Sequence, residues 1–124
     1  DNIRGVVDLV AMKSYSFAGE MGMDVTEAEI PEEFLAEAQA RRAELIERVV
    51  EHDDALMEAF LEGNEPSNED LKKTLRKAVL ANEIFPVMTG TALQNIGVQL
   101  VLDAVVDYLP SPLDLPDTHG TDPK

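Results

Sequence analysis

The chain has 124 residues, 44% of them hydrophobic, which is enough to bury the core of one domain. It contains no cysteine, and this excludes disulfides, thiolate catalysis and cysteine-based zinc sites. Its 25 acidic and 10 basic residues give a formal net charge of −15, which disfavours binding to nucleic acid or anionic membranes and favours basic protein partners.

The first thirty residues have the composition of β-strands. The run GVVDLVAMKSYSF (residues 5–17) is rich in Val, aromatic and β-branched residues, and AGEMGMD supplies two glycines before a second extended run, VTEAEI. We therefore expect an antiparallel hairpin in which residues 5–17 pair with residues 24–30.

Residues 31–62 have the pattern of a long helix. Pro31 suits a first helical turn, and Gly63 can supply the left-handed residue that ends a helix. Apolar residues recur at helical spacing and predict a core-facing stripe. This stripe comprises Phe34, Ala38, Leu45, Val49, Leu56 and Phe60, widened by Leu35, Ile46 and Met57.

Asp53 is out of place in a straight helix, because its carboxylate would enter the apolar stripe. As an N-cap, the same carboxylate would accept hydrogen bonds from the amides of the next turn. We therefore predict a break or kink at residues 52–54.

Acidic residues gather on the opposite face of this helix. The general interpretation is a solvated surface, and the more specific one is a docking surface for a basic partner. The residues concerned are Glu37, Glu44, Glu47, Glu51, Asp54, Glu58 and Glu62.

Ser67 and Asp70 have the spacing of a capping box, which predicts a helix over residues 67–81. Its inward-facing residues are expected to be Leu71, Leu75, Ala78 and Val79.

The C-terminal part predicts a strand, a loop and a helix. IFPVMT (residues 84–89) is short and apolar, as in a buried strand of an α/β sheet, with Pro86 favouring an edge position. VQLVLDAVVDYL (residues 98–109) is a helix that is apolar on nearly all sides and ends before PSP. Such a unit belongs to a larger sheet that this chain does not supply, so its exposed edge could recruit a second chain. The predicted fold class is thus α+β, ending in an incomplete α/β unit.

Several segments together resemble bacterial elongation factor G, the translocation GTPase of the ribosome. They are GVVDLVAMK, EIP, LMEAFLEG, LRKAVLANEI, GTALQNIGVQ and LDAVVDYLPSP, in the family's order. The resemblance implies a fragment of a longer cytoplasmic protein. Residues 1–83 would be the inserted subdomain of the GTP-binding domain, residues 84–110 its last strand, fifth guanine motif and final helix, and residues 111–124 a linker.

The resemblance assigns the loop after residue 90 to guanine binding. Thr91, Ala92 and Leu93 match the family's small-residue turn, whose backbone amides contact guanine; the family more often has Ser at position 91. The sequence lacks the phosphate loop GxxxxGK, the Asp-x-x-Gly motif and Asn-Lys-x-Asp. GTP or GDP, with magnesium, would therefore be bound by the full-length parent, and we expect no cofactor and no catalytic residue in the fragment alone.

The resemblance also gives the acidic helix a partner on the ribosome, the basic C-terminal domain of the stalk protein. The expected contacts are Glu47, Glu51, Asp54, Glu58 and Glu62, while Ala55 stands where better-known members carry an acid.

Two other interpretations follow from the residues. A free-standing acidic adaptor would bind basic proteins without any nucleotide. A hydrolase using His52, Asp53 and Asp54 has little support, because consecutive helical residues point in different directions. We expect no metal site, since the two histidines, His52 and His119, are far apart in sequence. The first residues also lack the pattern of a signal peptide, and no apolar run is long enough to span a membrane.

Overall fold

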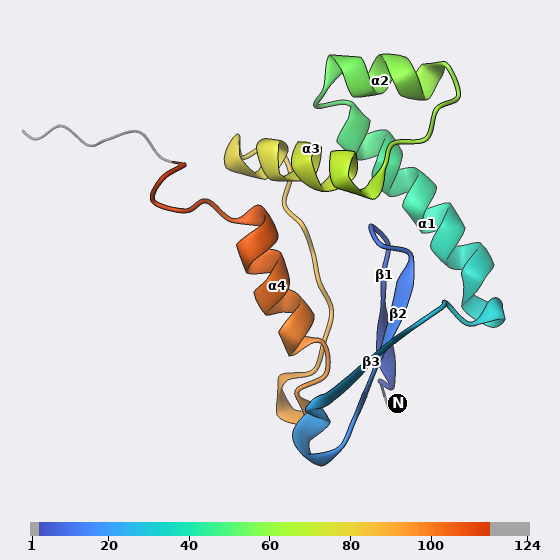
Figure 1. The fold of residues 1–124 in the computed structure, drawn as a ribbon, viewed down its shortest axis with the longest axis vertical. Coiled ribbons are helices and arrows are strands. Elements are labelled where there is room, and N and C mark those ends of the chain that lie inside the picture. Colours follow the sequence, from blue (N-terminus) through green and yellow to red (C-terminus); the bar gives the residue numbers. More distant parts are fainter. Residues whose placement is uncertain (1–2, 115–124) are drawn as a thin grey trace, which may run out of the picture.

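The computed structural model describes residues 3–114 and has the predicted α+β class (Figure 1). A three-stranded antiparallel sheet in the order β1-β2-β3 comes first, and the helices follow. The strands are β1 (Gly5–Asp8), β2 (Lys13–Ala18) and β3 (Asp24–Ala28). The α-helices are α1 (Glu32–Val50), α2 (Asp54–Leu61), α3 (Asn68–Leu80) and α4 (Val98–Tyr108), with short 3-10 helices η1 (Glu20–Gly22) and η2 (Ala92–Gln94).

The N-terminal sheet corrects the prediction of one long strand over residues 5–17. That segment is itself a hairpin, in which β1 pairs with β2 and Asp8 lies opposite Lys13. The Asp8 carboxylate accepts hydrogen bonds from the amides of Val10 at 2.7 Å and Ala11 at 3.1 Å, and so folds the chain back on itself. Strand β2 then pairs with β3, as expected for the second half of the predicted hairpin.

The predicted helix break at residues 52–54 is confirmed. Helix α1 ends at Val50, and Asp53 caps α2 by accepting a hydrogen bond from the Leu56 amide at 3.2 Å. Gly63 adopts a φ of 91° just after α2, where its amide donates to the Phe60 carbonyl at 3.0 Å. The chain therefore changes direction twice, and α2 leaves the axis of α1 (Figure 1).

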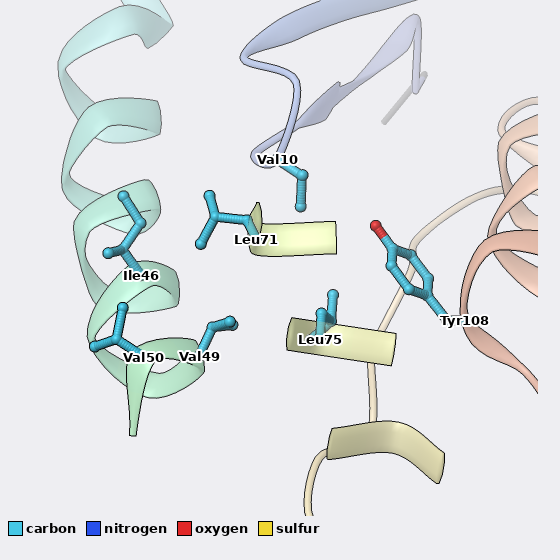
Figure 2. Packing of buried hydrophobic residues seen from close by; sticks show 7 residues of the cluster. All are labelled: Val10, Ile46, Val49, Val50, Leu71, Leu75 and Tyr108. Carbon is cyan, nitrogen blue, oxygen red and sulfur yellow. The ribbon is translucent and has the colours of Figure 1, made fainter. Parts of the chain in front are cut away.

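The hydrophobic core lies where α1, α3, the end of α4 and the β1–β2 turn meet (Figure 2). The capping box starts α3 as predicted, with the Asp70 amide donating to Ser67 Oγ at 3.1 Å. Leu71, Leu75 and Ala78 are buried as predicted, and Val79 packs against the core. The central cluster comprises Val10, Ile46, Val49, Val50, Leu71, Leu75 and Tyr108.

Most of the predicted stripe on α1 and α2 contacts this core, but its N-terminal end does not. Ala38, Ile46 and Val49 are buried, whereas Phe34 is 50% and Leu35 37% exposed. The start of α1 lies away from α3, and these two side chains remain partly open to solvent (Figure 1). The prediction was wrong for these two residues because helical periodicity does not show where the neighbouring helix ends.

The predicted strand over residues 84–89 is also wrong for the described chain. The segment is not a strand and pairs with neither edge of the sheet. Phe85 is 74% and Val87 88% exposed. On α4, Leu102 is 60% and Val106 77% exposed. An apolar segment becomes a strand only when another strand satisfies its amides and carbonyls, and the described residues offer none to it.

Helix α4 is attached to α3 at its C-terminal end. The Arg76 guanidinium donates to the carbonyl oxygens of Val106 at 3.2 Å and Asp107 at 2.9 Å. Lys72 Nζ lies 2.8 Å from Asp107 Oδ2, and this hydrogen bond raises the pKa of Lys72. These contacts fix the C-terminal end of α4, whereas the 90–97 segment leads into its N-terminal end.

Candidate functional site

The candidate guanine-binding loop (residues 90–97) is a closed turn held by its own backbone. Thr91 and Ile96 form an antiparallel bridge, with the Thr91 amide 2.9 Å from the Ile96 carbonyl and the Ile96 amide 3.1 Å from the Thr91 carbonyl. Helix η2 fills the turn, and Asn95, with a φ of 54°, ends it. The loop therefore has a defined shape without any regular sheet around it.

Two adjacent amides of this loop remain available. Gln94 N donates to the Thr91 carbonyl at 3.3 Å and Asn95 N to the Ala92 carbonyl at 3.2 Å. Within residues 3–114, the amides of Ala92 and Leu93 donate to no other group, as is usual at the start of a helical turn. Both residues are exposed, Leu93 by 94%. The loop thus offers two neighbouring donors to an external acceptor.

Glycines allow the two ends of the loop to approach each other. A Cβ on Gly90 would lie 2.6 Å from the Ile96 carbonyl oxygen, and one on Gly97 would lie 2.9 Å from the Thr89 carbonyl oxygen. Gly97 also has a φ of 80°, which disfavours other residues. Thr91, in contrast, makes no side-chain capping bond to η2. The backbone rather than the Thr91 hydroxyl shapes this turn.

The predicted docking acids are all exposed, and the break at residues 51–53 divides them between two helices. Glu47 lies on α1 and Glu51 at its C-cap, whereas Asp54 and Glu58 lie on α2 and Glu62 at its C-cap. In the described part of the chain none of these five residues forms an ion pair. We call this set, Glu47, Glu51, Asp54, Glu58 and Glu62, the acidic surface. Its charges are neutralised by no lysine or arginine of the described chain.

A groove between α2 and α3 borders the acidic surface but carries both signs of charge. Lys77 Nζ lies 3.5 Å from Asp53 Oδ2 in this groove. The Leu56 amide, followed by the charge of Lys77, holds the pKa of Asp53 below its ordinary value of 3.8. The groove is lined by Asp53, Ala55, Leu56, Asp70, Lys73, Thr74 and Lys77. It does not extend the purely acidic surface.

The residues of the hydrolase hypothesis have separate structural roles. His52 Nδ1 lies 2.9 Å from Glu83 Oε2, whereas Asp53 caps α2.

His119 lies outside the described residues. Between residues 3 and 114, no group of three or more His, Cys, Asp or Glu side chains is arranged to hold a metal ion. None of the described helices is long and apolar enough to cross a membrane.

No protein-family profile matches this chain. A crystal structure of a protein from Thermus thermophilus is similar, with 34% sequence identity and a TM-score of 0.76. The alignment covers 89% of this chain but only 16% of the Thermus chain. An arrangement like this one therefore occurs as a small part of a much longer polypeptide.

Proposed function

We propose that this chain is part of a ribosomal translocation GTPase related to elongation factor G, and that its 90–97 loop contacts the guanine base. The observation that carries the proposal is the pair of amides at Ala92 and Leu93 on a closed turn, which donate to no group among the described residues. The segment GTALQNIGVQ, which resembles that family, contains this pair, and LDAVVDYLPSP, which also resembles it, follows. The assignments of residues 1–83 to the insert, 84–110 to the GTPase core and 111–124 to a linker are part of the proposal; most of the linker lies outside the described residues.

Backbone amides can select guanine over adenine. Guanine presents the O6 acceptor at the position where adenine presents the N6 amino donor, so an amide donor pairs with one base and is repelled by the other. No side-chain chemistry is needed for this selection. The phosphates and magnesium of GTP would be bound by parts of the parent protein that this chain does not include.

The exposed apolar side chains support the same proposal. Phe85 and Val87 precede the loop and Val106 follows it, and each of the three is between 74% and 88% exposed. Large apolar side chains of this kind are usually buried, and an exposed group of them marks a surface that contacts another part of a protein. The length of the Thermus protein is consistent with a parent that supplies the missing strands.

The charge of the acidic surface favours binding of a basic protein. Within the proposed family that partner is the C-terminal domain of the ribosomal stalk protein. Each exposed ion pair contributes about 0–1 kcal/mol, so this contact should form fast, be weak and depend on salt. Ala55 adds no charge, so we expect the contact to be weaker or to be shifted toward Asp54 and Glu62.

The guanine contact is tested in the full-length protein with Ala92→Phe. The large ring should push the base away from the amides and weaken GDP binding by about tenfold, which corresponds to one lost hydrogen bond. The matched control is Ala36→Phe, which changes an exposed alanine on α1, outside the loop. Unchanged GDP affinity in Ala92→Phe would contradict the placement of the loop.

The docking contact is tested by replacing Glu51, Glu58 and Glu62 together with Lys. Turnover stimulated by the stalk protein should slow, and GDP affinity should stay the same. A control with the same change in charge replaces Glu32, Glu33 and Glu69, which are exposed and lie outside the acidic surface. Equal effects of both triple variants would contradict a localised docking site. A parent frame without GxxxxGK would instead favour the acidic adaptor.

A further inference from the structure

The connection between β2 and β3 lies against the candidate guanine-binding loop (Figure 1). Gly22, in η1, is buried and has a φ of 61°. A Cβ at this position would lie 2.7 Å from the carbonyl oxygen of Gln94 and 3.3 Å from that of Asn95. The backbone of the β2–β3 connection therefore touches the backbone of the loop directly, with no room for a side chain between them.

A side chain of α4 holds this contact from the other side. Gln99 Nε2 donates a hydrogen bond to the Gly22 carbonyl oxygen at 3.2 Å. Asn95 Nδ2 also lies 3.8 Å from the sulfur of Met23. These contacts connect residues that are 77 and 72 positions apart in the chain. The tip of the β2–β3 connection, the loop and the first turn of α4 thus form one packed unit.

We propose that Gly22 and Gln99 are positioning residues for the amides of Ala92 and Leu93, so that the β2–β3 connection sets the guanine contact without touching the base. This inference rests on the proposed function. Gln94 and Asn95 donate to the carbonyls of Thr91 and Ala92, which belong to the same turn. A displacement of the Gln94 carbonyl would therefore rotate η2 and move both free amides. A shift of this kind weakens a contact that depends on exact geometry.

Position 22 requires glycine for two reasons, a positive φ and a lack of space for a Cβ. The positive φ disfavours any residue with a side chain, and the Gln94 carbonyl oxygen occupies the space that a Cβ would need. Gly63 has only the positive φ, of 91°, since none of the described residues has an atom within 4 Å of a Cβ built there. Gly22→Ala and Gly63→Ala therefore share the backbone strain, and only the first displaces the loop.

The experiment compares these two variants in the full-length protein by their affinities for GDP and for 6-thio-GDP. Sulfur accepts hydrogen bonds less well than oxygen. The affinity for GDP divided by the affinity for 6-thio-GDP therefore exceeds one when the amides contact the base. This ratio is insensitive to a general loss of stability. Gly22→Ala should weaken GDP binding about tenfold and bring the ratio close to one. Gly63→Ala should leave both the GDP affinity and the ratio unchanged.

A second variant and a second readout keep the test decisive. Gln99→Met removes the donor to Gly22 at similar side-chain volume and should lower the affinity ratio in the same direction by about threefold. In the full-length protein, Gly22→Ala should speed hydrogen exchange at the Thr91 and Ile96 amides, which form the bridge of the loop.

The outcomes separate this inference from the proposed function. Wild-type GDP binding and affinity ratio in both Gly22→Ala and Gln99→Met would overturn the positioning role alone. Wild-type protein that binds no GDP would overturn the proposed function and the positioning role together. A lower affinity ratio in Gly22→Ala and Gln99→Met, with the wild-type ratio in Gly63→Ala, would support both the proposed function and the positioning role.

Discussion

The guanidinium of Arg42 donates a hydrogen bond to the carbonyl oxygen of Val10 at 2.7 Å. It also donates to the Leu9 carbonyl at 2.9 Å, and pairs with Glu65 at 2.9 Å and Asn68 at 3.0 Å. The Arg42 side chain is only 13% exposed. One residue of α1 therefore holds both the β1–β2 turn and the start of α3, and it keeps Val10 in the core.

Arg42→Ala should lower the free energy of unfolding by about 2–3 kcal/mol, because it leaves partly buried carbonyls without their donor. Arg42→Lys should lose most of the same stability, since a single ammonium cannot reach all four groups. Urea denaturation of the isolated chain measures both. The neighbouring Arg41 makes one exposed pair with Glu44, so Arg41→Ala should cost less than about 0.5 kcal/mol. Equal losses at the two arginines would contradict the bridging role of Arg42.

Two apolar residues should respond very differently to truncation. Leu75 is 5% exposed and lies in the central cluster, so Leu75→Ala should cost about 2–5 kcal/mol. Val106 is 77% exposed, and Val106→Ala should change the stability of the isolated chain by less than about 0.5 kcal/mol. Chemical denaturation gives both values. A large loss at Val106 would mean that the apolar face of α4 is covered in solution, for example by a second copy of the chain.

The cap of α2 should be measurable by substitution. Asp53→Ala removes the acceptor of the Leu56 amide and should lower the urea midpoint of unfolding, as the loss of an N-cap usually does. Asp53→Asn keeps a capping oxygen and should lower the midpoint less. The helix content, followed by circular dichroism, should fall in the Ala variant as α2 frays. Equal stability of the two variants would show that the cap contributes nothing.

Two carboxylates that accept backbone hydrogen bonds, Asp53 and Asp114, also predict a pH dependence. The Leu56 amide lowers the pKa of Asp53, and the Ser111 amide, at 2.7 Å, lowers the pKa of Asp114. A carboxyl whose folded-state pKa is lowered stabilises the fold above its ordinary pKa of 3.8. That contribution is lost as the pH falls through the folded-state pKa.

The free energy of unfolding should therefore decline as the pH is lowered below about 4, and Asp53→Asn and Asp114→Asn should each make this decline less steep. Chemical denaturation at a series of pH values measures the slope. Asp103→Asn, at an exposed acid without an ion pair among the described residues, is the control. An unchanged acid slope in both variants would contradict the role of the two carboxylates.

Local signals in the sequence accounted for the helices and their ends. Asp53 predicted the break between α1 and α2, Ser67 with Asp70 predicted the start of α3, and the apolar run before PSP predicted α4. The turn at Asp8 carried a local signal too, an Asp whose side chain can accept from the amides that follow it, and the prediction of one strand there overlooked it. The identity of the 90–97 loop as a turn of small residues was also visible, but its free amides were not.

The sequence by itself determined which segments are helical and where they are capped, because caps and periodic faces depend on residues three or four positions apart. Only the tertiary structure decided that residues 84–89 remain unpaired, that Phe34 lies outside the core and that Gly22 touches the Gln94 carbonyl. Each of these depends on what a distant segment places beside the residue. A strand, a buried face and a backbone contact all need a partner, and no local pattern specifies which partner that is.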